Sequence, residues 1–238
     1  MDIRILNSIN GRLSLRAPQE ESLRALASAL DSAPSMLEKE REVDSLLSIL
    51  SAKFPTLTDF EREFPSLCFA LATGVGKTRL MGAFISYLHL AHGIKNFFVL
   101  APNLTIYDKL ITDFTPNTSK YVFKGIAEFA AYPPQIVTGD NYENALTGDI
   151  LSPVSINIFN ISKINSEVRG GKSPRIKRLR ETIGDSYFSY LANLPDLVML
   201  MDESHRYRAS AGVRSLNELN PLLGLELTAT PFTEGRKA

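Results

Sequence analysis

Several features are scarce in this chain, and each scarcity excludes a class of protein. There is one cysteine, Cys68, so no internal disulfide can form. No apolar run reaches the roughly 18 residues of a membrane-spanning helix, and we expect no membrane partner. Lys and Arg number 26 and so do Asp and Glu, so a polyanion must be bound locally rather than by a general basic field. No secretory signal opens the chain, and we expect a cytoplasmic location.

The 238 residues, of which 44% are hydrophobic, can form one large domain or two small ones with a sizeable core. Residues 17–30 and 36–50 show the apolar spacing of amphipathic helices. Ser35 precedes the second of these, and Glu38 follows three residues later, which is the pattern of a capping box. We therefore expect a helical N-terminal segment over residues 1–60.

From residue 67 onward, short apolar runs are separated by segments of helical period. The runs lack clean polar–apolar alternation, which is typical of strands buried on both faces of a parallel sheet. A helix over 77–91, ended by Gly93, follows the first run and gives a βαβ unit. We expect an α/β domain over 61–238, with a mostly parallel, doubly wound sheet covered by helices on both faces and the N-terminal helices beside it. The expected strands are 67–71, 96–101, 134–139, 154–159, 196–201 and 225–229.

One stretch departs from this alternation. Residues 169–180 (RGGKSPRIKRLR) carry six basic side chains in twelve positions. They read as a mobile surface loop that leads into a helix over 175–192. A solvated charged face is one interpretation and a local phosphate-contacting patch is the other.

The stretch 71–78 reads LATGVGKT, between an expected strand and an expected helix. Gly74 and Gly76 let successive backbone amides converge on a phosphate, and the following helix offers its positive end. Lys77 can reach the β and γ phosphates, and the hydroxyl of Thr78 can ligate Mg²⁺. The sequence therefore predicts a phosphate-binding loop for ATP and Mg²⁺. The predicted nucleotide-binding residues of this loop are Thr73, Gly74, Val75, Gly76, Lys77 and Thr78.

Two carboxylates follow the apolar run 196–201, at the end of a strand where parallel sheets bind ligands. Asp202 can hold Mg²⁺ through its water shell, and Glu203 can polarise the water that attacks the γ-phosphate. Alone, such carboxylates are most often simply solvated. Thr228 and Thr230 then follow the last run in the segment TATP, and three motifs in this order favour an ATP-hydrolysing site.

These three segments resemble those of superfamily 2 helicases and translocases. Their phosphate loop commonly reads x-A-T-G-x-G-K-T. Most phosphate loops begin with glycine, but this superfamily accepts another residue at that position, and here the residue is Leu71. Their D-E-x-H box is similar to 202–205, and their T-A-T segment is similar to 228–230. The resemblance implies a RecA-like fold and a nucleic-acid motor driven by ATP. It also implies that Lys77 and Glu203 are catalytic and that His205, Thr228 and Thr230 couple the nucleotide state to nucleic-acid binding.

Weaker correspondences extend the resemblance. Gln19 resembles an upstream glutamine that reads adenine in many of these motors, because an amide can both donate to and accept from that base edge. An exposed glutamine at a helix start is the alternative. Other segments at strand ends resemble those that hold the phosphodiester backbone, which position a strand without reading its sequence. Their residues are Ala101, Pro102, Asn103, Thr138, Gly139, Asn160 and Ser162.

The D-E-S-H-R sequence at 202–206 most resembles the Res subunit of type III restriction enzymes. That resemblance implies an ATP-dependent DNA translocase or helicase of the kind found in site-specific endonucleases, with double-stranded DNA and a modification methyltransferase subunit as partners. An RNA helicase or remodeller, a small-molecule phosphotransferase and a non-catalytic nucleic-acid-binding module are the alternatives.

The printed sequence stops at Ala238, shortly after the TATP segment. The second motor domain of this superfamily, which supplies arginines that close over the γ-phosphate, is not part of it. An arginine finger contributes about 10³- to 10⁵-fold in rate. We therefore expect a piece of a longer chain that turns over little ATP alone.

Overall fold

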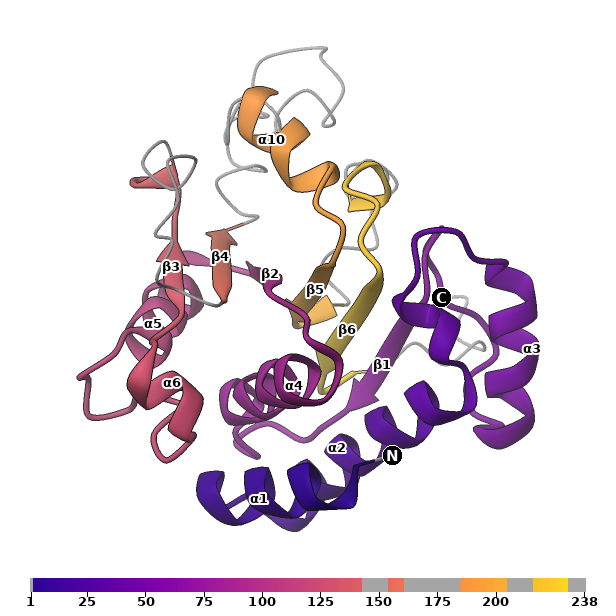
Figure 1. The fold of residues 1–238 in the computed structure, drawn as a ribbon, viewed down its shortest axis with the longest axis horizontal. Coiled ribbons are helices and arrows are strands. Elements are labelled where there is room, and N and C mark those ends of the chain that lie inside the picture. Colours follow the sequence, from indigo (N-terminus) through magenta and orange to yellow (C-terminus); the bar gives the residue numbers. More distant parts are fainter. Residues whose placement is uncertain (1, 143–153, 161–184, 205–215, 231–238) are drawn as a thin grey trace.

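A single sheet of six parallel strands forms the centre of the molecule (Figure 1). The computed structural model describes residues 2–142, 154–160, 185–204 and 216–230. The strand order is β1-β6-β5-β2-β4-β3, and every neighbouring pair runs parallel. The predicted parallel sheet is therefore confirmed. The strands are β1 (Ser66–Ala70), β2 (Asn96–Ala101), β3 (Gln135–Val137), β4 (Ser155–Asn160), β5 (Leu197–Asp202) and β6 (Leu223–Thr228).

Helices cover both faces of the sheet, as the sequence predicts for an α/β fold. One face packs against a large apolar cluster that includes residues of α1, α2, α4 and α5, and the other against a smaller cluster to which α10 contributes. None of the described helices is long and apolar enough to cross a membrane. The helices of the described residues are α1 (Ile3–Leu13), α2 (Ala17–Ser32), the 3₁₀ helix η1 (Pro34–Leu37), α3 (Val43–Lys53), α4 (Lys77–His92), α5 (Leu104–Phe114), α6 (Ala127–Ala131) and α10 (Asp185–Ala192).

Helix α4 lies between the sheet and the N-terminal helices, and it determines where the phosphate-loop region sits. The pattern predicts one apolar face, but every residue from Leu80 to Leu88 is buried, because α1 and α2 pack on the side away from the sheet (Figure 1). Gly93 ends the helix in a left-handed conformation (φ 71°), as predicted. Helix α1 was not predicted; Asp2 caps it by accepting from the amides of Arg4 and Ile5 at 3.0 and 3.1 Å.

Residues 36–50 do not form the predicted single helix. The 3₁₀ helix η1 ends at Leu37, and α3 begins only at Val43. Ser35 therefore lies inside η1 instead of capping a long helix, and Glu38 is extended, so the predicted capping box was wrong.

The charged residues between η1 and α3 bond to a distant turn instead. Lys39 Nζ donates to the carbonyl of Asn220 at 2.8 Å, and Arg41 Nη2 donates to the carbonyl of Pro221 at 2.7 Å. Both acceptors directly precede β6, so these bonds tie the N-terminal region to the strand that leads to Thr228. The segment between η1 and α3 is not helical, and its side chains bond to residues about 180 positions away in the sequence. Local periodicity cannot indicate such contacts.

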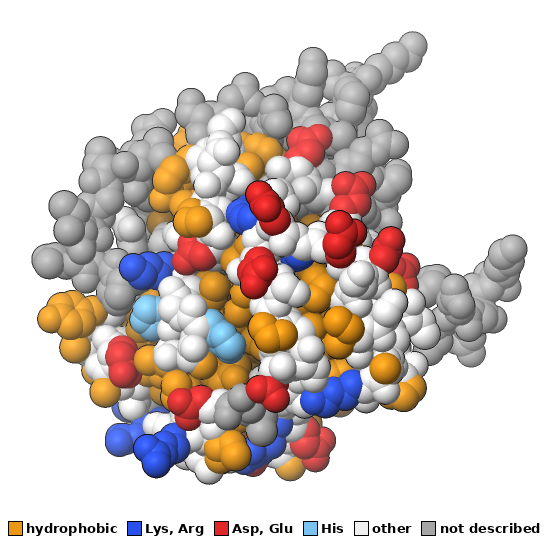
Figure 2. Space-filling model, turned by 45° about the vertical axis from the view of Figure 1, so that its right-hand side comes forward, with side chains coloured by type: hydrophobic (Ala, Val, Ile, Leu, Met, Phe, Trp, Pro, Cys, Tyr) orange, Lys and Arg blue, Asp and Glu red, His pale blue; other side chains and the backbone are white. Residues whose placement is uncertain are grey.

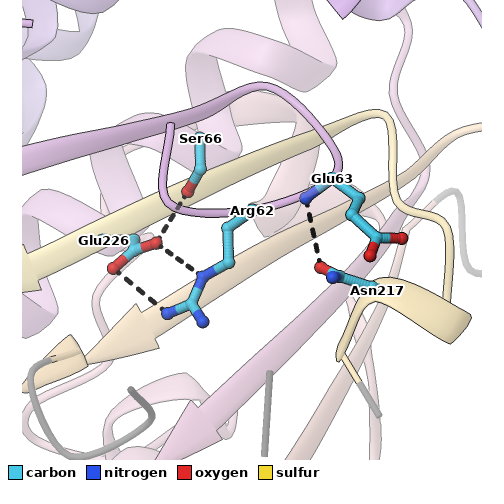
Figure 3. A network of polar contacts seen from close by, with 5 residues as sticks. All are labelled: Arg62, Glu63, Ser66, Asn217 and Glu226. Carbon is cyan, nitrogen blue, oxygen red and sulfur yellow. Dashed lines mark hydrogen bonds and ion pairs between the residues drawn. The ribbon is translucent and has the colours of Figure 1, made fainter. Parts of the chain in front are cut away.

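A buried ion pair joins the segment before β1 to the middle of β6 (Figure 3). Arg62 Nε lies 3.0 Å from Glu226 Oε1, and the two side chains are 0% and 3% exposed. Ser66 Oγ donates to the same carboxylate oxygen at 2.8 Å. A side chain at Gly224 would overlap this cluster, because its Cβ would lie 2.6 Å from Ser66 Oγ. The pair therefore fixes β1 against β6, the strands that carry the phosphate loop and the TAT segment.

We expect Arg62→Met to lower the free energy of unfolding by about 3–5 kcal/mol, because it leaves the Glu226 carboxylate buried without its cation. The double variant Arg62→Met/Glu226→Met should lose less than the sum of the single variants. Urea unfolding measures both. The partly exposed Glu20–Arg24 pair is the control, and its removal should cost about 1 kcal/mol or less. Additive losses at Arg62 and Glu226 would contradict the interpretation.

Candidate nucleotide-binding site

The predicted phosphate loop connects the end of β1 to the first residue of α4. Gly74 and Gly76 have positive φ angles of 84° and 96°, a conformation that side chains disfavour. Ala72, Thr73, Gly74 and Gly76 are exposed. The loop is anchored at its start, where the Leu71 amide donates to the carbonyl of Thr228 at 2.9 Å. A strand end, a glycine turn and a helix N-terminus thus meet where an anion can approach.

Gln19 is the inner support of this loop. It is 1% exposed, and its amide nitrogen donates to the carbonyls of Val75 at 3.0 Å and Gly76 at 2.8 Å. Its oxygen accepts from the backbone amide of Arg16 at 2.8 Å. A Cβ at Gly76 would lie 2.7 Å from the same nitrogen. Gln19 is therefore not an exposed helix-start glutamine, because its amide nitrogen bonds to the loop and its oxygen bonds to the backbone that begins α2.

Lys77 extends from the start of α4 to the two carboxylates that end β5. Its ammonium contacts Glu203 Oε1 and lies 3.7 Å from Asp202 Oδ1. Burial raises the pKa of the Asp202 carboxyl, the Lys77 charge opposes this, and Glu203 adds to the rise. A buried carboxylate in this position is stabilised by any nearby cation. The structure thus brings the first two predicted motifs into contact.

Glu203 occupies an unusual backbone conformation. Its φ is 51°, in the left-handed region that residues other than glycine seldom adopt. Asp202, directly before it, ends β5 and is 7% exposed. The sharp change of direction after the strand lets the adjacent carboxylates take different positions, as two different roles require.

The third motif lies on the neighbouring strand. Thr228 ends β6 and is fully buried, and its hydroxyl accepts from the amide of Thr230 at 3.1 Å. Since β6 lies between β1 and β5, the TAT segment emerges between the phosphate loop and the carboxylates. His205 lies outside the described residues, so the coupling role predicted for it and for the two threonines stays a prediction.

The hydroxyl of Thr78 is engaged by a residue that the sequence did not single out. Lys109, on α5, donates from Nζ to Thr78 Oγ1 at 2.9 Å. The same ammonium lies 3.5 Å from Asp113 Oδ2, one turn further along α5. A lysine six residues into an ordinary amphipathic helix carries no sequence signal for this contact. Arg16, whose Nη1 donates to the Gly74 carbonyl at 3.3 Å, was missed for the same reason.

The predicted nucleic-acid segments also follow strand ends, on the other half of the sheet. Ala101 ends β2 and pairs in register with Asn160, the last residue of β4. Asn103 caps α5 by accepting from the Ile106 amide at 2.9 Å, and Pro102 precedes it. Thr138 lies just beyond β3, which is shorter than predicted.

The predicted segment 138–139 lies in the turn after β3. The Thr138 amide donates to Asn141 Oδ1 at 2.7 Å, which shapes the turn, and Gly139 within it is exposed.

Ser162 and the basic stretch 169–180 lie outside the described residues, and so does the first part of the predicted helix 175–192. Acidic, basic and hydrophobic side chains are interspersed on the face seen in Figure 2, in line with the balanced charge.

The described residues fit a magnesium ion bound with a nucleotide. Mg²⁺ is usually held by one or two protein ligands together with waters and phosphates. Thr78 Oγ1 and the Asp202 carboxylate are oxygens of the kind that could serve as such ligands, and Asp202 Oδ1 is buried and accepts no hydrogen bond from the described residues. Lys77 and the exposed glycine turn add the charge and amides that phosphates require. The donor set therefore suits Mg²⁺ and a polyphosphate.

Comparison with known proteins decides the family. Residues 12–233 match the family model described as type III restriction enzyme, res subunit. The chain belongs to this family. The prediction of a Res-like superfamily 2 motor domain is thereby confirmed.

The chain is also similar to individual proteins. The chain is 27% identical over 176 residues to a probable type III restriction-modification enzyme HindVIP Res subunit from Haemophilus influenzae, covering 71% of this chain and 30% of that protein. A solved structure, a nuclease-deletion mutant of the type ISP restriction-modification enzyme LlaGI in complex with a DNA substrate mimic, matches with a TM-score of 0.44 and 14% identity. That match covers 82% of this chain and 18% of the other.

We expect Gln19→Leu to loosen the phosphate loop, because the carbonyls of Val75 and Gly76 lose their donor. The free energy of unfolding should fall by about 1–3 kcal/mol, and amides of residues 73–77 should exchange faster while those of α3 are unchanged. Hydrogen–deuterium exchange measures this. Gln135→Leu, at the far edge of the sheet, is the matched control. Unaltered exchange at 73–77 would show that Gln19 does not support the loop.

Proposed function

We propose that this chain binds Mg-ATP at the phosphate loop and is the first motor domain of an ATP-dependent DNA translocase or helicase of the Res type. The observation that carries the proposal is the position of Lys77, which extends from the loop to Asp202 and Glu203. A lysine placed between a glycine turn and two carboxylates suits phosphoryl transfer to water. Membership of the Res family supports the same function.

Each residue in the site has a separate task in this proposal. Lys77 and the loop amides bind the phosphates, and Thr78 and Asp202 hold the magnesium ion. Glu203 orients the attacking water and takes its proton. When bound, Mg²⁺ neutralises charge on the phosphate oxygens. Lys77 would exchange its carboxylate contacts for phosphate contacts when ATP enters.

The same proposal assigns the remaining predicted residues. The loop contacts of Gln19 leave its reading of adenine as a proposal, in which the amide exchanges a loop carbonyl for the base. Thr228 and Thr230, with His205, would couple the nucleotide to nucleic acid. The segments beyond β2, β3 and β4 would hold a phosphodiester backbone without reading its sequence.

The chain covers 30% of the curated relative's length, so the activity of the whole protein is also a proposal. We infer that a second motor domain in the parent chain supplies the missing arginines, and that this chain alone hydrolyses little ATP. The relative's name, a restriction-modification enzyme, supports a modification subunit as a partner. We infer that this partner is a methyltransferase, that the track is double-stranded DNA and that the protein acts in the cytoplasm.

Lys77→Ala should weaken Mg-ATP binding by about 100-fold or more, which corresponds to about 2.7 kcal/mol. The reason is that Lys77 supplies the charge nearest the phosphates. Glu203→Gln should still bind Mg-ATP, because it removes only the group that activates water. Isothermal titration of both variants tests this, with the exposed Lys120→Ala as control. Unchanged affinity in Lys77→Ala would refute the site.

ATP hydrolysis by the chain should be close to that of Glu203→Gln, with or without duplex DNA, because the arginines of a second domain are needed. Brisk hydrolysis that is lost in Glu203→Gln would show that the site is complete without them. Anisotropy with labelled duplex DNA and single-stranded RNA identifies the track. Tighter binding of RNA would favour an RNA helicase over a DNA motor.

A further inference from the structure

Lys109 lies outside the three motifs, yet its ammonium is bonded to the residue proposed to ligate magnesium. Nζ donates to Thr78 Oγ1 at 2.9 Å. One lysine outside the motifs thus lies beside a side chain that is proposed as a ligand for the metal ion.

A hydroxyl has only two lone pairs, and a cation that uses one hinders the approach of another. Lys109 and Mg²⁺ would each bind the same oxygen atom, Thr78 Oγ1. The positive charges of the ammonium and the metal ion would then be close together and would repel each other. The side chain of Lys109 is 51% exposed, so it can move away without disturbing the core.

The alternative partner for the ammonium is already beside it. Asp113 Oδ2 lies 3.5 Å from Lys109 Nζ, and the Asp113 side chain is 7% exposed. Its other oxygen, Oδ1, is buried and accepts no hydrogen bond from the described part of the chain. An ammonium that leaves Thr78 would therefore gain a buried carboxylate that has acceptor capacity to spare. Lys109 thus has two partners, Thr78 on α4 and Asp113 one helical turn further along α5.

We propose that Lys109 is a positioning residue that competes with Mg²⁺ for the Thr78 hydroxyl. Lys109 holds the hydroxyl in place, and magnesium binds by displacing the ammonium toward Asp113. The inference rests on the proposed Mg-nucleotide function and adds a residue to it. Since α5 begins beside Asn103, displacement would act on the helix that starts at a predicted nucleic-acid segment.

The test is the magnesium dependence of nucleotide binding, read with a fluorescent ADP analogue so that no hydrolysis occurs. In Lys109→Met, the Mg²⁺ concentration for half-maximal binding should fall by about threefold to tenfold, because a competing cation is gone. Affinity in EDTA should be unchanged. Lys109→Arg keeps the charge and should retain a midpoint near that of the wild type.

Two further variants make the result interpretable. Lys120→Met removes the same charge from an exposed site and should leave the midpoint unchanged. Lys109→Gln repeats the charge removal with a polar side chain and takes the place of Lys109→Met if that variant does not fold. Equal loss of affinity with Mg²⁺ and with EDTA would mean that Lys109 binds phosphate, and this would overturn the proposal.

Failure of the inference differs from failure of the proposed function. If the wild type binds the nucleotide but the midpoint is the same in all Lys109 variants, competition is refuted and the site remains. If the wild type binds no nucleotide at any magnesium concentration, the proposed function is refuted and the inference with it.

Discussion

The parallel direction of all six strands is the constraint on which the remaining structure depends. It places every strand end at one edge of the sheet, so segments that are far apart in the sequence emerge side by side. The order β1-β6-β5 brings the phosphate loop, the TAT segment and the carboxylates together. The order β2-β4-β3 does the same for the three predicted nucleic-acid segments. The residues proposed to bind nucleotide and those proposed to hold nucleic acid thus lie on two halves of the sheet, and β5 and β2 are the strands that meet between them.

The N-terminal region holds the predicted phosphate loop through hydrogen bonds to its backbone. Gln19 and Arg16 engage the carbonyls of three consecutive loop residues, Gly74, Val75 and Gly76. Because these carbonyl oxygens already accept hydrogen bonds from Gln19 and Arg16, they do not occupy the space that a phosphate needs. On the other side of β1, the Arg62–Glu226 pair fixes the strands that carry the loop and the TAT segment. Two distant parts of the sequence therefore determine the geometry of one short loop.

The predictions that succeeded depend on local pattern. The glycine turn, α4 with its Gly93 end, and the carboxylates after an apolar strand each follow from a few adjacent residues. The predictions that failed depend on contacts between distant residues. Lys39 and Arg41 stay out of a helix because they bond to the turn before β6. No spacing indicates that Lys109 reaches Thr78, or that Arg62 and Glu226 are buried together, since such pairs form only once the sheet exists.

The left-handed backbone at Glu203 has a further consequence. A residue with a side chain costs about 1–2 kcal/mol in this conformation, and glycine does not. Glycine at 203 would therefore favour the local fold, but it would remove the carboxylate that contacts Lys77. The stability of the native state and the chemistry of the site favour different residues at this position. Glutamate at this position lowers the stability of the native state slightly, so a search for stabilising substitutions in this chain would select against the proposed activity.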